Sequence, residues 1–194
     1  MNINVNKIFS KFFGHLKTVL RHKKYVYKAM KDCGHPIQGL VHDMSKFSPI
    51  EFFESVKYYT DDRSPIENAK EDKGYSAAWL HHKGRNKHHS QYWLDCSWGK
   101  TTPQEIPWKY LLELICDGIG AGKAYGDNRG EKWDRSTPLK YWNDRDQTSY
   151  YHPNTRKKLE WYYVQIAING WEYVSSRIRE DGDYYEWEHE LDRC

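Results

Sequence analysis

The sequence predicts a single all-α domain, a helical bundle that spans residues 1–194, and three observations support this fold class. Apolar residues recur at three- and four-residue steps in most segments, as they do on one face of a helix. No segment alternates apolar and polar residues like a half-buried strand, and no internal repeat is present. A chain of 194 residues also has the usual length of one domain with its own core.

Composition indicates a globular protein of the cytoplasm. Aromatic residues make up 16% of the chain, which provides apolar area for a core although 29% of the residues are charged. The four cysteines are scattered and form no C-x-x-C pair, as is typical of reduced thiols. No apolar run reaches the ~18 residues of a membrane span, and no signal peptide is recognisable. We therefore expect a cytoplasmic protein with no membrane partner.

The first part of the chain is expected to form three helices. The first covers residues 15–32, where the apolar period places His22 on the inward face. The second covers residues 36–47 and opens on a proline. The third covers residues 49–58 and begins with the sequence SPIE, a capping box with proline at the first helical position.

The remaining elements are expected as follows. Residues 60–74 are polar and contain Pro and Gly, so they predict a surface loop. The next helix is expected to carry His82 and to end at a glycine. Residues 97–107 form a connector, residues 108–124 form the most apolar helix, and residues 154–180 form one long amphipathic helix.

Histidines and aspartates at metal-ligand spacing are the strongest functional signal. His22 precedes an adjacent pair, His42 and Asp43, and Asp117 follows inside an apolar helix, where a charged group is costly to bury without a partner. A single inward histidine is usually a hydrogen-bonded core residue, so the inference depends on all four together. Histidine with carboxylate suits Mn, Fe, Co, Ni or Zn. These residues therefore predict a divalent transition-metal site built from packed helices.

The order H…HD…D, with the lysine of HDMSK, resembles the HD-domain superfamily of metal-dependent phosphohydrolases. The resemblance covers about residues 15–125, a metal-site core. It implies an all-helical fold and the same four residues as primary ligands: His22, His42, Asp43 and Asp117. The fuller pattern, HDxSKF followed by AWLHHKGRNKHHSQYW, also resembles a small, largely uncharacterised family of bacterial and phage proteins.

The segment HHKGRNKHH offers three further histidines: His82, His88 and His89. Two-metal members of the superfamily carry extra histidines on separate helices, whereas these three lie within eight residues of the chain. They could hold a second metal from one loop, or act as acid–base groups beside a single metal. Because basic residues interleave them, the segment could also be a solvated loop.

Polar side chains near these histidines are candidates for binding substrate. Lys46 follows Asp43 by one helical turn, so its ammonium could hold a phosphate or stabilise transition-state charge. Arg85 and Lys87 could do the same, and Asn86 could orient a ligand through its amide.

The sequence therefore predicts a metal-dependent phosphohydrolase acting on a nucleotide or related phosphate ester, with Lys46 and the three further histidines as catalytic groups. Its expected partner is this small-molecule phosphate. Two alternatives stay open. The basic, aromatic segment could bind nucleic acid without catalysis, to which a net charge of +3 is no obstacle. Alternatively, an HD-type fold could use two irons to activate oxygen.

Overall fold

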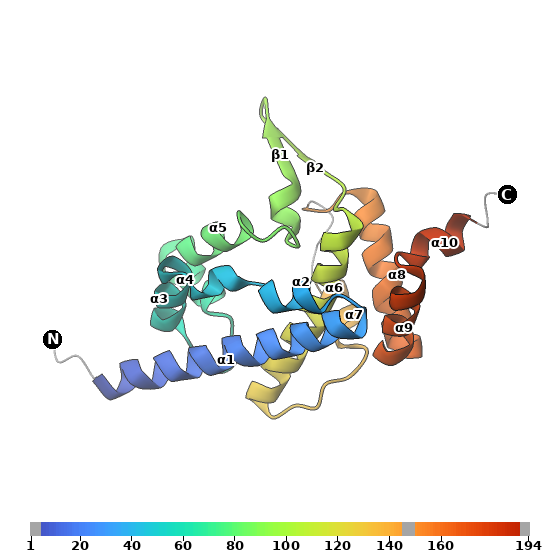
Figure 1. Ribbon diagram of the computed structural model, residues 1–194. Helices are drawn as coiled ribbons and strands as arrows, with labels where there is room; N and C mark the ends of the chain where they lie inside the picture. Colours follow the sequence, from blue (N-terminus) through green and yellow to red (C-terminus); the bar gives the residue numbers. More distant parts are fainter. Residues whose placement is uncertain (1–4, 145–149, 191–194) are drawn as a thin grey trace.

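The computed structural model describes residues 5–144 and 150–190, and their fold is all-α, which confirms the predicted class. Long helix α1 (Val5–Asp32) runs along one side of the molecule, and α6 (Trp108–Arg129) crosses it (Figure 1). The N-terminal half of α1 packs against α3 (Pro49–Tyr58), which in turn packs against α4 (Pro65–Lys73) and α5 (Ala77–Lys83). On the far side of α6 lie α8 (Pro153–Asn169) and α9 (Trp171–Asp181). Within the described residues no helix combines the length and apolar character needed to cross a bilayer.

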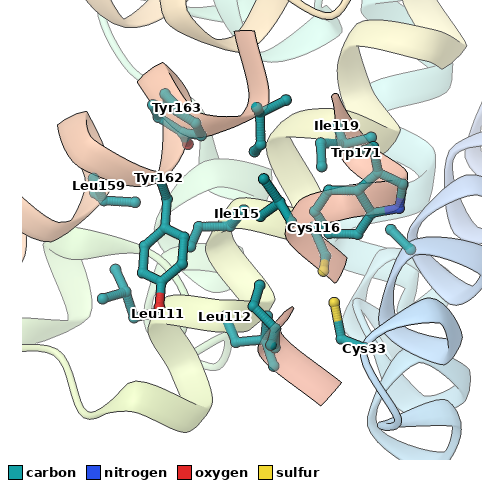
Figure 2. Packing of buried hydrophobic residues seen from close by; sticks show 14 of the residues in the cluster. Cys33, Leu111, Leu112, Ile115, Cys116, Ile119, Leu159, Tyr162, Tyr163 and Trp171 are labelled. Carbon is teal, nitrogen blue, oxygen red and sulfur yellow. The ribbon is translucent and has the colours of Figure 1, made fainter. Parts of the chain in front are cut away.

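The core forms where α6 meets α1 on one side and α8 (Pro153–Asn169) on the other. Figure 2 shows Leu111 of α6 near Tyr162 and Ile119 of α6 near Trp171, with Ile115 between them. The side chains of Leu111, Ile115 and Ile119 are fully buried. Cysteine contributes to this core in its reduced form, because the described cysteines are free thiols.

A glycine lets α1 and α6 approach closely next to the predicted metal ligands. A Cβ at Gly120 would lie 2.4 Å from Cγ2 of Val26 and 3.0 Å from its backbone nitrogen. Val26 is one turn after His22 on α1, and Gly120 is three residues after Asp117 on α6. The close approach of the two helices therefore brings these two ligands together.

The segment between α1 and α6 carries most of the remaining site residues. It consists of short elements: α2 (Pro36–Val41), η1 (Met44–Phe47), α3, α4 (Pro65–Lys73), α5 (Ala77–Lys83) and η2 (Ser90–Trp93). The chain then continues through α6, α7 (Thr137–Asn143) and α8 to α9 (Trp171–Asp181) and α10 (Tyr184–Glu190).

The prediction of a loop over residues 60–74 was wrong, because α4 occupies most of it. Pro65 takes the first helical position and Gly74 ends the helix in the left-handed conformation, with a φ of 77°. Ala69 is completely buried against the body of the protein. The same Pro and Gly that suggested a loop are the start and stop signals of a short helix.

Two further expectations were wrong. Residues 97–107 are not a simple connector, since β1 (Leu94–Ser97) and β2 (Lys100–Pro103) form an antiparallel hairpin. Its turn residues, Trp98 and Gly99, have φ values of 52° and 73°, as in the tight turns that match strand twist. Because the hairpin is almost entirely exposed, it has no apolar alternation to detect. The helix expected over residues 154–180 is broken at Gly170, where φ is 85°.

Candidate metal centre

The adjacent pair His42 and Asp43 lies at a break between α2 and η1, not inside the continuous helix that residues 36–47 predicted. Successive side chains on a helix point about 100° apart, so an unbroken helix would aim the two residues in different directions. Here Asp43 adopts the left-handed conformation, with a φ of 52°, which is uncommon outside glycine but better tolerated by aspartate than by most residues. The break turns both side chains toward α1 and α6.

The four predicted ligands come together. One donor atom from each of His22, His42, Asp43 and Asp117 lies within 4.8 Å of the others. Nε2 of His22 is 3.1 Å from Oδ1 of Asp117, and Nε2 of His42 is 3.2 Å from Oδ2 of Asp43. This first ligand set draws on α1, the α2–η1 break and α6, which are the elements expected from the sequence.

A second ligand set lies beside the first and shares Asp43 with it. Its members, Asp43, His82, His88 and His89, again place one donor atom each within 4.8 Å of the others. Oδ1 of Asp43 is 3.4 Å from Nε2 of His82 and 3.6 Å from Nε2 of His88. The Asp43 carboxylate thus turns Oδ2 to the first set and Oδ1 to the second.

The donor atoms of both sets fit metal ions. Nε2 of His22, His42, His88 and His89 and Oδ1 of Asp43 are buried and have no hydrogen-bond partner. Buried polar atoms without a partner are costly, and several converging on one point call for a common partner. These buried clusters could therefore hold metal ions, with Asp43 bridging the two positions.

Two glutamates that sequence reasoning missed hold the histidine rings in place. Oε1 of Glu113 accepts a hydrogen bond from Nδ1 of His42 at 2.8 Å and lies 3.3 Å from Nδ1 of His88. Oε2 of Glu51 accepts from Nδ1 of His82 at 2.8 Å. In a neutral ring, a carboxylate at Nδ1 keeps the proton there and leaves Nε2 as the free nitrogen aimed at the metal position, which is the usual outer support of a metal-bound histidine.

Glu51 was predicted as part of a capping box, and only half of that motif forms. Ser48 caps α3 by accepting a hydrogen bond from the backbone nitrogen of Glu51. The Glu51 carboxylate does not return to Ser48, because it binds Nδ1 of His81 at 2.6 Å as well as that of His82. Glu113 left a weaker signal, a single acidic residue one helical turn before Asp117 in an apolar helix.

The centre keeps its carboxylates ionised. Burial alone would raise the pKa of Asp43, but His42, Lys46 and His82 hold it well below its usual value. Burial also opposes ionisation of Glu113, whose pKa the bonds from His42 and His88 lower to about 2. Ionised carboxylates are the form that binds a cation.

Lys46 lies where the sequence placed it, beside the centre. Its ammonium is 2.7 Å from Oδ2 of Asp43. Burial would lower its pKa, but Asp43 and Asp117 raise it above the usual value, so the amine stays charged. Lys46 also lines a pocket of about 230 Å³ that reaches ligands of both sets, among them His22 and His89.

The basic residues of the HHKGRNKHH segment do not face this pocket. Arg85 and Lys87 are exposed and are absent from the pocket lining, although both were predicted to bind substrate. Asn86 supports the candidate metal ligand His82. Its amide donates to the backbone oxygen of His82 at 2.9 Å and to Oγ of Ser45 at 2.8 Å. The segment therefore separates its histidines, which point inward, from its cations, which point to solvent.

Fold and site together define an all-helical protein with a buried histidine–carboxylate centre able to hold metal ions. Over residues 11–163, most of its length, the chain matches a family model described as "Family of unknown function (DUF5662)", and it belongs to that family. The matched region contains both ligand sets in full. No curated protein and no solved structure matches the chain.

Proposed function

We propose that this protein is a phosphohydrolase of the HD type that uses two divalent metal ions bridged by Asp43. The observation that carries the proposal is the shared carboxylate, with one oxygen toward each ligand set and a charged lysine 2.7 Å away. Paired metal ions, when bound, generate a nucleophile from water at neutral pH and neutralise charge on a phosphoryl group. The order of the ligands along the chain agrees with the resemblance to the HD-domain superfamily.

The chain's own residues have separate tasks in this reaction. Lys46 binds a non-bridging phosphate oxygen and offsets the negative charge that develops during transfer. His89 lines the pocket, and burial together with His88 and His82 lowers its pKa well below the usual value. His89 therefore acts as a neutral ligand of the second metal position. Glu51 and Glu113 orient the rings through the Nδ1 atoms of His82 and His42.

The donor chemistry narrows the choice of metal. Imidazole nitrogen and carboxylate oxygen, without thiolate, suit Mn, Fe, Co, Ni or Zn. Iron deserves separate measurement, because a carboxylate shared by two histidine-rich positions also suits two irons that activate oxygen. Iron with substrate-dependent oxygen consumption, and no phosphate release, would establish that alternative.

Metal content and hydrolysis test the proposal together. The purified protein is loaded with each of the five metals, and release of phosphate is measured from nucleotides, sugar phosphates and a generic phosphodiester. We expect about two metal equivalents, activity that a chelator abolishes, and loss of both metals in Asp43→Ala. The control, Asp95→Ala, removes an exposed carboxylate on β1. Metal-independent turnover, or equal metal content in Asp43→Ala and wild type, would refute the proposal.

A further inference from the structure

The pocket over the metal centre is small and closed in by short helices. Its volume of about 230 Å³ is below the ~300–1,000 Å³ of sites that take drug-sized ligands. We call the part lined by the metal ligands and Lys46 the inner end, and the part lined by residues such as Thr18, Tyr59 and Ile66 the outer end. Helices α5 and α6 also contribute to the lining. With a phosphate at the inner end, the remaining space suits a compact group.

The pocket carries few positive charges. Lys46 and Arg63 are the only Lys or Arg side chains among the described residues that line the pocket. The Arg63 guanidinium is already bound by both carboxylate oxygens of Glu71, one of them at 2.7 Å. His15 also lines the outer part, and burial with the nearby Lys46 lowers its pKa to about 4, so it is neutral at pH 7. A second phosphate would therefore have to compete with Glu71 for Arg63.

The outer wall instead offers hydroxyl groups. Tyr59 and Thr18 line the pocket, and their hydroxyl oxygens are 3.0 Å apart. Tyr59 donates to Oδ1 of Asp61 at 2.8 Å, and the amide of Asn128 donates to Thr18 at 3.2 Å. Gly14 makes room for the tyrosine, because a Cβ at that position would lie 2.5 Å from its ring. The tyrosine ring is thus held in place, with a carboxylate behind its hydroxyl.

From this arrangement we infer the substrate class of the proposed phosphohydrolase: a phosphomonoester whose leaving group is compact, uncharged and hydroxylated, such as a small polyol or sugar. The inference depends on the proposed function. The phosphate occupies the inner end beside Lys46. The leaving group's hydroxyls donate to the remaining lone pairs of Thr18 and Tyr59, because the protons of these two hydroxyls are already used between them and by Asp61. The small volume of the pocket and the pairing of Arg63 with Glu71 both disfavour nucleoside di- and triphosphates.

A panel of esters tests this inference on the metal-loaded protein. It contains glycerol 3-phosphate, propyl phosphate, ribose 5-phosphate, AMP and ATP. We expect kcat/KM for ribose 5-phosphate to exceed that for ATP by at least about tenfold. Glycerol 3-phosphate should be preferred to propyl phosphate, which has a similar size but lacks the hydroxyls.

Two variants test whether the pocket wall causes the preference for a small, hydroxylated leaving group. Tyr59→Phe should raise KM for glycerol 3-phosphate about 3- to 10-fold, the effect of one hydrogen bond, and leave KM for propyl phosphate and both kcat values unchanged. The control, Tyr25→Phe, removes a hydroxyl that binds Asp127 away from the pocket. Ile66→Phe, at the half-buried start of α4, narrows the pocket without touching the hydroxyls. It should impair ribose 5-phosphate more than glycerol 3-phosphate.

The possible results separate the two proposals. Metal-dependent hydrolysis that favours AMP or ATP would overturn the substrate class and leave the phosphohydrolase standing. A Tyr59→Phe variant that affects glycerol 3-phosphate and propyl phosphate equally would likewise overturn it. No hydrolysis of any ester with any of the five metals would refute the proposed function, and the substrate class with it.

Discussion

Glu113 binds Nδ1 of His42 at 2.8 Å, on the edge of the ring opposite to the nitrogen that faces Asp43. The same carboxylate oxygen lies 3.3 Å from Nδ1 of His88, a member of the second ligand set. One glutamate on α6 therefore orients a histidine in each set. The two ligand sets are therefore linked through this outer contact as well as through Asp43, which belongs to both.

Replacing this carboxylate should weaken both metal positions. In Glu113→Gln the amide cannot accept from both rings with the strength of a carboxylate, so we expect metal affinity to fall about 10- to 100-fold. Competition with a chelating dye measures it. The control, Glu131→Gln, changes an exposed glutamate that pairs only with Arg129 among its described contacts. Unchanged affinity in Glu113→Gln would show that the rings are held by packing alone.

The two ligand sets predict distinct metal stoichiometries. Because His22 belongs only to the first set and His82 only to the second, alanine at either should remove about one metal equivalent. His35→Ala, which removes an exposed histidine, should remove none. Elemental analysis after gel filtration provides the count. Full metal content in His82→Ala would mean that the second set binds no metal of its own and only supports the residues around a single metal.

Lys46 should matter for turnover and not for metal retention. Lys46→Met keeps the length of the side chain and removes the charge that offsets the phosphate, so kcat/KM should fall about 10²-fold or more. Metal content should stay the same or rise, because the ammonium 2.7 Å from Asp43 competes with a cation for that oxygen. Loss of metal together with activity would instead assign Lys46 a structural role.

The contact between Gly120 and Val26 should control both stability and metal binding. In Gly120→Ala the added methyl would meet Val26, and overpacking of this kind costs about 1–3 kcal/mol. By moving α1 away from α6, the substitution should also weaken metal binding at His22 and Asp117. Gly126→Ala is the control, since its Cβ would lie 3.4 Å from the nearest atom. Denaturant unfolding and metal titration should show both effects in Gly120→Ala only.

His15 should make the protein less stable as the pH falls. Burial, with Lys46 next, lowers its pKa to about 4 in the folded protein, whereas the unfolded value is about 6.5. Between these values the unfolded chain binds a proton that the folded protein does not. The stabilisation is therefore complete above pH 6.5 and is lost as the pH falls toward 4.

Comparison with His15→Leu isolates this effect. With a chelator present, the free energy of unfolding from pH 7 to pH 5 should fall by about 2 kcal/mol more in wild type than in His15→Leu. The other histidines are common to both proteins, so their titration cancels in the difference. Parallel pH profiles would mean that His15 can take up a proton in the folded state.

Much of the fold could be predicted because its signals are local. The apolar period of α1 and α6 reports directly which face of a helix is buried, and it placed His22 and Asp117 inward. The Ser48 cap and the proline after it marked the start of α3, whose end at Tyr58 also agrees. The prediction failed where the same local signal is compatible with two different structures. Pro65 and Gly74 bound a helix instead of a loop, and Gly170 breaks a helix whose apolar period continues on both sides.

The sequence by itself determined an all-α fold and indicated that His22, His42, Asp43 and Asp117 form one group with Lys46 beside it, and the structure brings these residues together. Only the tertiary structure decided that His42 and Asp43 lie at a helix break, that Asp43 serves two ligand sets, and that Glu51 and Glu113 support the rings. It also decided that Arg85 and Lys87 face solvent. The physical reason is that the helical period records which face of one element is buried. The sharing of the Asp43 carboxylate between two ligand sets depends instead on distances between side chains of different elements, namely α5, α6 and the α2–η1 break. Those distances are set by how the elements pack, and no spacing along the chain encodes them.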